Sequence, residues 1–89
     1  MVESQVEITN QRGLHARAAA KFVHLASGFE SRVTVCNGRD EADGKSILSL
    51  MVLGASMGTE LTLRCEGDDE QKALDALADL VGGGFDEES

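Results

Sequence analysis

The chain has 89 residues, 42% of them hydrophobic and 27% charged, which suits one small folded domain rather than a disordered chain. Sixteen acidic residues against eight lysines and arginines give a formal net charge of −8. This balance argues strongly against sequence-independent binding to nucleic acid and disfavours an anionic membrane surface, because both depend on basic side chains. The N-terminus lacks the basic and apolar regions of a secretory signal, and no apolar run could span a bilayer, so we expect a cytoplasmic protein.

The hydrophobic pattern changes several times between the two-residue period of strands and the 3.6-residue period of helices. Asn37-Gly38 is typical of a hairpin turn, Ser46 of a helix N-cap, and Asp68 with Gln71 of a capping box. The predicted order is strand, helix, strand, strand, helix, strand, helix, at residues 2–8, 16–27, 32–36, within 39–43, 47–53, 61–65 and 69–81.

Hairpins imply antiparallel pairing, and amphipathic helices need an apolar sheet face to cover, so the pattern predicts a two-layer α+β sandwich. Its exposed sheet face should be polar and carry Glu3, Gln5, Glu7, Thr62 and Arg64. We expect a single domain over residues 1–84, followed by an acidic C-terminal tail over residues 85–89 that frays from Asp86 onward.

The segment Gly13-Leu14-His15-Ala16-Arg17 carries the clearest chemistry. A helix start presents backbone N–H groups without intrahelical partners, which favours binding of an anion. Arg17 adds a guanidinium suited to phosphate, and a neutral ring nitrogen of His15 can attack a phosphoryl donor. Phosphoryl oxygens on that ring would face the amides of Ala16, Arg17 and Ala18. On this local pattern alone, a polar cap or surface histidine is the more ordinary interpretation.

Three segments together resemble a known family: RGLHARAAAKFV, DGKSILSLMVLGA and GTELTLRCEGDDEQKALDAL. They are similar to the HPr family, the histidine-containing phosphocarrier proteins of the phosphoenolpyruvate-dependent phosphotransferase system, from residue 2 to residue 81. The resemblance implies an open-faced β-sandwich, βαββαβα, with a four-stranded antiparallel sheet and three helices on one face. It also implies that His15 is phosphorylated at Nδ1 and that Arg17 stabilises the phosphoryl group.

Ala18 departs from the pattern, because many members that serve sugar uptake carry proline at this position. Proline pre-sets the backbone of a first helical turn and removes an amide, whereas alanine keeps that N–H available to an anion. The alanine-rich start resembles the nitrogen-related branch of the system, which has regulatory roles.

Ser46 has two interpretations. A serine before Ile47-Leu48 is an ordinary N-cap, worth about 1 kcal/mol. The resemblance implies a second role for Ser46, as a regulatory site phosphorylated by an ATP-dependent serine kinase/phosphorylase. A phosphate at Ser46 would be tolerated, because this residue lies at a helix N-terminus.

Two surfaces of the chain are candidate sites at which partner proteins could bind. Residues Ile47, Leu48 and Met51 could be core, but the resemblance implies an exposed apolar patch that docks enzyme I and IIA-type acceptors. The second surface is a basic strip that could orient acidic partners, although a solvated helix face is the simpler interpretation. Its members are Arg17, Lys21, His24 and Lys45.

Neither a cofactor nor a metal is implied. Cys36 and Cys65 are too few for a disulfide framework, which favours free thiols, and with His15 and His24 they form no known zinc spacing.

Our leading hypothesis is a monomeric phosphoryl carrier that accepts phosphate from phospho-enzyme I on His15 and donates it to a IIA-type protein. It would serve sugar uptake or nitrogen and carbon regulation, with catalysis resting on its partners rather than on a stand-alone enzyme. The alternative is a regulatory binding module that controls effector proteins according to its phosphorylation state, without a role in sugar transport. A third interpretation is an interaction domain with a vestigial histidine.

Overall fold

A computed structural model of the protein describes residues 1–87. Its elements follow the predicted order, with one short 3-10 helix, η1, added at the C-terminal end. In chain order they are β1 (Val2–Glu7), α1 (Ala16–Ala26), β2 (Arg32–Cys36), β3 (Glu41–Asp43), α2 (Ile47–Leu53), β4 (Glu60–Glu66), α3 (Glu70–Gly82) and η1 (Gly84–Asp86).

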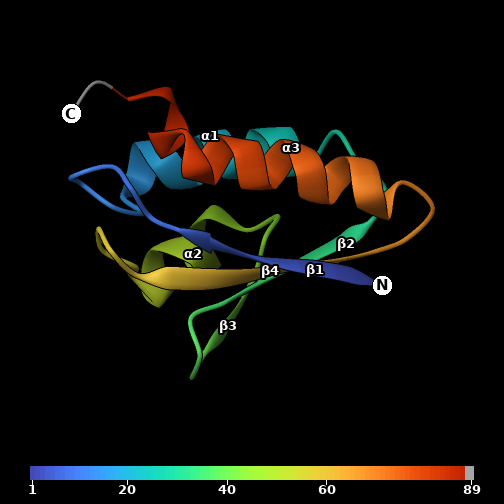
Figure 1. The fold of residues 1–89 in the computed structure, drawn as a ribbon, viewed down its shortest axis with the longest axis horizontal. Helices are drawn as coiled ribbons and strands as arrows, with labels where there is room; N and C mark the ends of the chain where they lie inside the picture. The colour runs from blue at the N-terminus through green and yellow to red at the C-terminus, as the bar shows by residue number, and fades with distance from the viewer. Residues whose placement is uncertain (88–89) are drawn as a thin grey trace.

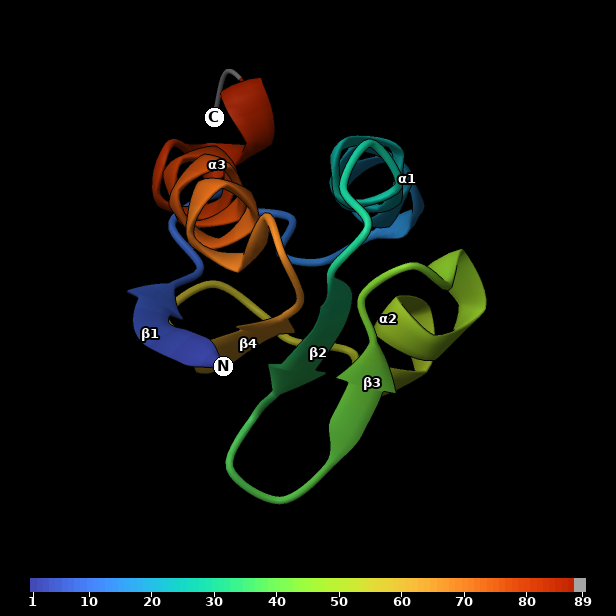
Figure 2. The same ribbon diagram turned by 90° about the vertical axis from the view of Figure 1, so that its right-hand side faces the viewer.

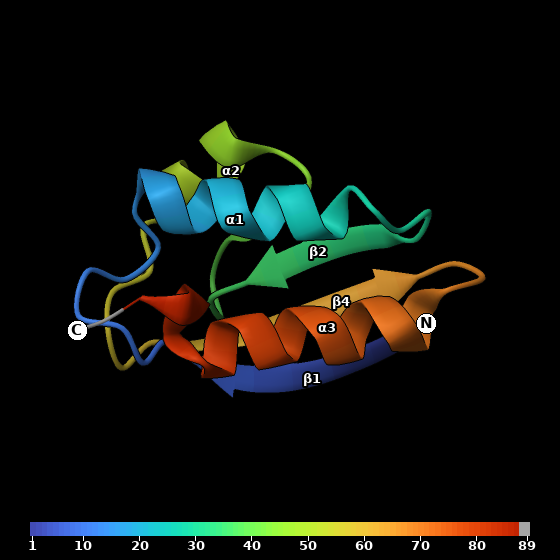
Figure 3. The same cartoon turned by 90° about the horizontal axis from the view of Figure 1, so that it is seen from above.

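The four strands form one antiparallel sheet in the order β1-β4-β2-β3. Helices α1 and α3 lie side by side over one face of this sheet, and α2 packs beside α1 and the β3 edge (Figures 1 and 2). Viewed from above, α3 runs along β1 and β4, while α1 lies between β2 and α2 (Figure 3). The predicted open-faced α+β sandwich is therefore confirmed.

The core lies between the sheet and the two long helices. Register places Val2 and Val33 opposite Cys65, so these three side chains point to the same, helix-covered face. The helices contribute apolar side chains spaced three and four residues apart, as an amphipathic helix requires. The buried members are Ala18, Ala19, Phe22 and Ala26 of α1, and Ala73, Leu74, Leu77 and Val81 of α3.

The other face of the sheet is open and polar, as predicted. Glu3, Gln5 and Glu7 are exposed along β1. Arg64 on β4 forms ion pairs with Glu3 at 3.4 Å and with Glu41 at 3.6 Å, which joins three strands across this face. Pairs this exposed contribute little stability, so the open face is held chiefly by its backbone ladder.

Both cysteines are free thiols. Burial raises the pKa of Cys65 in the core, and burial together with the neighbouring Glu41 carboxylate raises the pKa of Cys36 on the open face. A raised pKa lowers the thiolate fraction, so neither side chain is activated as a nucleophile.

The start of α3 differs from the predicted capping box at Asp68 and Gln71. The N-cap is Asp69, and its carboxylate bonds across the fold instead of to its own helix. It accepts hydrogen bonds from the amides of Glu30 at 2.9 Å and Ser31 at 3.0 Å, and from the Ser31 hydroxyl. These donors, the Ser31 hydroxyl first, hold the pKa of Asp69 below its ordinary value. The carboxylate therefore joins the start of α3 to the segment entering β2.

Residues 85–87 pack on the domain, so the tail predicted to begin at residue 85 and to fray from residue 86 is wrong for this part. Phe85 is fully buried, and the Lys21 ammonium donates to its carbonyl oxygen at 2.8 Å. Both Phe85 and Asp86 have positive φ, 57° and 59°, which turns the chain back across α1. Burial of the aromatic ring offsets the cost of that backbone. The remainder of the predicted tail, residues 88–89, lies outside the described residues.

The hydrogen bonds of Asp69 predict a pH effect on stability. Because the pKa of this carboxyl is lower in the folded than in the unfolded chain, its contribution is present above its ordinary pKa and is lost as the pH falls through the lowered value. We expect Asp69→Asn to lower the Tm at neutral pH and to flatten the fall of Tm in acid, measured by circular dichroism.

Asp79→Asn removes the same charge from an exposed position of α3 and is the matched control. It should keep the wild-type dependence of Tm on pH. An Asp69→Asn profile that parallels the control would contradict the assigned role.

Candidate functional site

A tight loop places His15 at the start of α1. The Gly13 amide donates to the Asn10 carbonyl oxygen at 3.2 Å, and the Leu14 amide donates to the Ala55 carbonyl oxygen at 2.8 Å. Gly13 has φ +67°, and a Cβ there would lie 2.5 Å from the Ala55 oxygen. This position therefore requires glycine on both conformational and steric grounds. The loop fixes His15 relative to the segment that follows α2.

His15 is the N-cap of α1. Its backbone is extended, with φ −80° and ψ 179°, and its carbonyl oxygen accepts the first helical hydrogen bond, from Ala19, at 2.8 Å. Its ring replaces the usual hydroxyl or carboxylate cap, because Nδ1 accepts from the Arg17 amide at 3.2 Å. An acceptor nitrogen must carry a lone pair, so the proton of the neutral ring resides on Nε2. The nitrogen that faces the helix end is thus the one that carries the lone pair.

The first turn of α1 presents the predicted amides. Ala16, Arg17 and Ala18 precede the first helical hydrogen bond, which is made by the Ala19 amide. No acidic side chain occupies this turn, and Ala18 is fully buried in the core. The dipole of the helix and these donors favour a negative group beside Nδ1.

The other ring nitrogen is held by the C-terminal segment. The Nε2–H of His15 donates to Oε2 of Glu87, and the Asn10 side-chain amide donates to Oε1 of Glu87 at 2.8 Å. Burial would raise the pKa of Glu87, but the hydrogen bonds from Asn10 and His15, together with nearby positive charge, outweigh it and hold this pKa below its ordinary value.

Asn10 and Glu87 were missed by the reasoning from sequence. Glu87 is 72 residues from His15 and lies in a segment expected to fray. The sequence feature that could have indicated this contact is Phe85, an apolar residue after three glycines. Burial of its side chain requires the tail to fold back.

The Arg17 guanidinium is exposed, and within residues 1–87 it forms no ion pair or hydrogen bond. It stands at a groove of 560 Å³ between α1 and the C-terminal end of α3. Lys21 and His24, the other basic residues predicted on this face, line the same groove. The full lining is Arg17, Ala20, Lys21, His24, Leu25, Leu80 and Asp86.

Lys45 is absent from that groove, although the sequence placed it with the basic strip. Its ammonium donates to the Phe29 carbonyl oxygen at 2.7 Å, which ties the chain before α2 to the chain after α1. Lys45 is half-buried, and its partner is this carbonyl oxygen.

Helix α2 carries the predicted apolar patch. Ile47, Leu48 and Met51 are 41%, 73% and 44% exposed, so the alternative that they are core residues is wrong. Leu50 is fully buried and anchors the helix, while Ser46 caps it by accepting from the Ser49 amide at 3.2 Å. Helix α2, which carries this patch, packs against α1, the helix that His15 caps (Figure 3).

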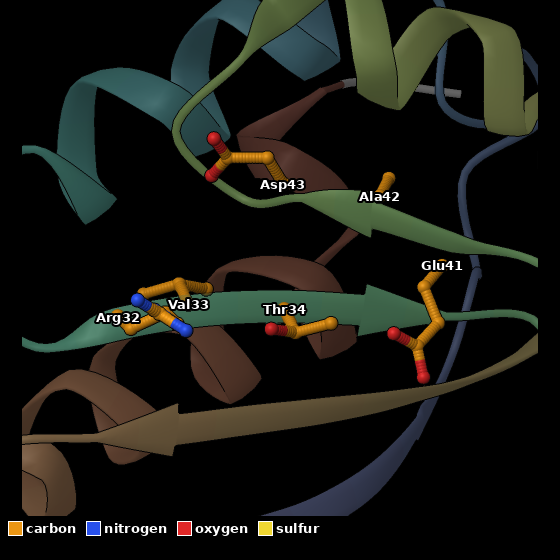
Figure 4. Close-up of a pocket in the computed structure, with 6 residues that line it drawn as sticks. All are labelled: Arg32, Val33, Thr34, Glu41, Ala42 and Asp43. Carbon is orange, nitrogen blue, oxygen red and sulfur yellow. The ribbon is translucent and has the colours of Figure 1, made fainter.

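A separate hollow of 470 Å³ lies over β2 and β3 (Figure 4). Glu41 extends from β3 toward β2 and β4, consistent with its ion pair to Arg64. The predicted functional residues are all absent from its lining, which consists of Arg32, Val33, Thr34, Glu41, Ala42 and Asp43.

Within residues 1–87, three or more His, Cys, Asp or Glu side chains are nowhere grouped so as to hold a metal ion. Across the same residues, no helix combines the length and apolarity needed to cross a membrane.

An open-faced α+β sandwich with a histidine capping an open helix N-terminus defines a small histidine-bearing carrier domain. The family described as "PTS HPr component phosphorylation site" matches residues 2–82. The chain therefore belongs to the HPr family, and its role is that of a phosphocarrier of the phosphotransferase system.

Proteins that are similar in sequence and in structure support this family assignment. The chain is 46% identical over 87 residues to the phosphocarrier protein HPr of Neisseria meningitidis serogroup A, covering 98% of each chain. It is 46% identical over 88 residues to the phosphocarrier protein NPr of Shewanella violacea, covering 99% of this chain and 97% of the relative. The crystal structure of HPr-C-His from Thermoanaerobacter tengcongensis matches with a TM-score of 0.94 at 46% identity, covering 100% of both chains.

The cap at Ser46 predicts a measurable stability effect. Ser46→Ala removes the acceptor for the Ser49 amide, so we expect the free energy of unfolding to fall by about 1 kcal/mol. Ser46→Asp restores a good N-cap and should recover most of that loss.

Ser56→Ala, at an exposed loop position, is the matched control and should be neutral. Equal free energies of unfolding for Ser46→Ala and Ser56→Ala in urea titrations would contradict the capping role.

Proposed function

We propose that Nδ1 of His15 accepts a phosphoryl group from phosphorylated enzyme I and passes it to a histidine of a IIA-type protein. The observation that carries this proposal is the hydrogen bond from the Arg17 amide to Nδ1, which puts the lone pair of that nitrogen at the open end of α1. A phosphoryl group bound there would lie beside the free amides of the first turn.

The transfer needs no proton to move. The Nδ1 lone pair forms the new N–P bond, while the bond from phosphorus to the donor atom of enzyme I breaks and its electron pair leaves with the donor. The Nε2 proton of His15 stays in place, so the phosphorylated ring carries a positive charge next to the negative phosphoryl group. Onward transfer reverses these changes and releases His15 as a neutral imidazole.

The Arg17 amide can donate a hydrogen bond both before and after the phosphoryl group is transferred. It donates to Nδ1 in the unphosphorylated protein, and this bond must open as the donor phosphorus approaches. The same N–H, with those of Ala16 and Ala18, can then donate to phosphoryl oxygens. The guanidinium of Arg17 is free of other partners within the described residues and can turn toward the added charge. Charge on the oxygens is the principal feature of a phosphoryl transition state, so these donors act where they are needed.

Docking rests on the neighbouring surfaces. The apolar patch of Ile47, Leu48 and Met51 supplies exposed hydrophobic area, and Arg17, Lys21 and His24 supply a basic rim. On a chain with a net charge of −8, a local basic surface can orient acidic partners for a brief contact.

Ser46 is proposed as a regulatory site for a serine kinase/phosphorylase. It directly precedes the apolar patch, so a phosphate there adds negative charge beside the docking surface while remaining compatible with the helix N-terminus. The remaining proposals are a cytoplasmic location and a monomeric carrier, which would leave the α1 and α2 surfaces free for successive partners.

The central experiment uses phosphoenolpyruvate and a cognate enzyme I. Wild-type protein should take up one acid-labile phosphoryl group per chain, because Nδ1 of His15 is the nucleophile. His15→Ala should take up none, measured by mass spectrometry under alkaline conditions.

His24→Ala removes the other histidine and should still reach one phosphoryl group per chain at the end point. Uptake by His15→Ala equal to that of wild type would refute the assignment.

A second candidate function is regulation of effector proteins according to the phosphorylation state. It is favoured by Ala18, which stands where many sugar-system members have proline, and by the 46% identity to an NPr. Affinity capture with phosphorylated and unphosphorylated protein, compared with sugar uptake in a deletion strain, separates the two. State-dependent capture with normal uptake supports regulation, whereas loss of uptake of a sugar contradicts a purely regulatory role.

A further inference from the structure

The carboxylate of Glu87 contacts the histidine ring on the side opposite the reacting nitrogen. It accepts from Nε2–H, whereas Nδ1 faces the Arg17 amide. The two ring nitrogens point to different edges of the imidazole, so the carboxylate leaves the space beside Nδ1 open. With side-chain exposures of 17% for His15 and 13% for Glu87, the pair is largely shielded from water, where a charge-assisted hydrogen bond is stronger.

We propose that Glu87 is a positioning residue for phosphoryl transfer, which fixes the proton of His15 on Nε2 and stabilises the positive charge of the phosphorylated ring. This role rests on the proposed function of His15. Asn10 supports it by holding the carboxylate in place.

The chemistry of imidazole gives the reason. A neutral ring has one N–H, and a lone pair is available at Nδ1 only when the proton resides on Nε2. A carboxylate acceptor at Nε2 selects that tautomer and orients the ring, as carboxylates do for other reactive histidines. When Nδ1 forms its bond to phosphorus, the ring becomes cationic, and the Glu87 carboxylate then faces a full positive charge. The interaction is therefore stronger after transfer begins than before it.

The surrounding contacts keep Glu87 ionised and in place. Asn10 is 2% exposed and divides its two side-chain N–H groups between the Gly13 carbonyl oxygen, at 2.9 Å, and Oε1 of Glu87, at 2.8 Å. The same side chain thus joins the loop before His15 to the tail that covers its ring. The charge of Arg12 also favours the carboxylate form, consistent with the lowered pKa of Glu87.

The tail has its own anchors, so Glu87 does not depend on the histidine for its position. Phe85 is fully buried two residues earlier, and its carbonyl oxygen accepts from the Lys21 ammonium at 2.8 Å. A side chain placed by packing in this way can preorganise the ring before any donor arrives.

The test compares Glu87→Gln with Glu66→Gln. Glutamine at position 87 keeps the size and an acceptor oxygen and removes the charge, while Glu66→Gln removes the same charge from the exposed end of β4. The first readout is the imidazole NMR spectrum of ¹⁵N-labelled unphosphorylated protein at about pH 8.5, where imidazoles are neutral. The second is the steady-state rate of transfer from phospho-enzyme I, with the Tm confirming that both variants fold.

We expect Glu87→Gln to shift the Nε2 proton of His15 upfield and to speed its exchange with solvent, because a neutral acceptor forms a weaker hydrogen bond than a carboxylate. The same change should lower kcat about 10-fold, with KM unchanged because the docking surfaces are intact. Glu66→Gln should match wild type in both readouts. A Glu87→Gln variant that keeps either the wild-type shift and exchange rate of the Nε2 proton or the wild-type kcat would overturn the positioning role. A wild-type chain that accepts no phosphoryl group would instead overturn the proposed function, and this role with it.

Discussion

The hydrogen bond between the Arg17 amide and Nδ1 of His15 is the interaction on which the proposed site depends. One side chain serves both as the cap of α1 and as the proposed carrier of the phosphoryl group. The cap places the ring at the positive end of the helix dipole, and it selects the nitrogen that carries the lone pair. The same amide that holds the nitrogen at rest is available to the anion once it is attached. Stability of the helix start and reactivity of the histidine are therefore linked through one contact.

The fold contributes rigidity around that contact. Ala18, Ala19 and Phe22 are buried within the first two turns of α1, so the helix cannot shift without opening the core. The Gly13 turn fixes the approach from one side, and the C-terminal segment covers the ring from the other. Exposed apolar and basic side chains lie on the neighbouring helix surfaces, while the opposite sheet face carries charges paired with one another.

The element order, the open-faced sandwich and the placement of His15 before a helix could be predicted because they follow from local periodicity and from the preferences of helix ends. Contacts between distant segments could not be predicted in this way. Asp69 was predicted only as the first residue of the last helix, but its carboxylate bonds to the chain entering β2, and Glu87 reaches His15 across 72 residues. Lys45 was grouped with other cations by charge alone, but a carbonyl oxygen holds it elsewhere. Such partners depend on how the layers pack, and no spacing in the sequence encodes them.

The most direct measurement is the change in backbone amide chemical shifts of ¹⁵N-labelled protein when it is phosphorylated by phosphoenolpyruvate and enzyme I. If the phosphoryl group resides on Nδ1 at the open end of α1, the largest downfield shifts will fall on the amides of residues 16–18. Shifts that are largest around Ser46 or His24, with the first turn of α1 unchanged, would contradict that placement.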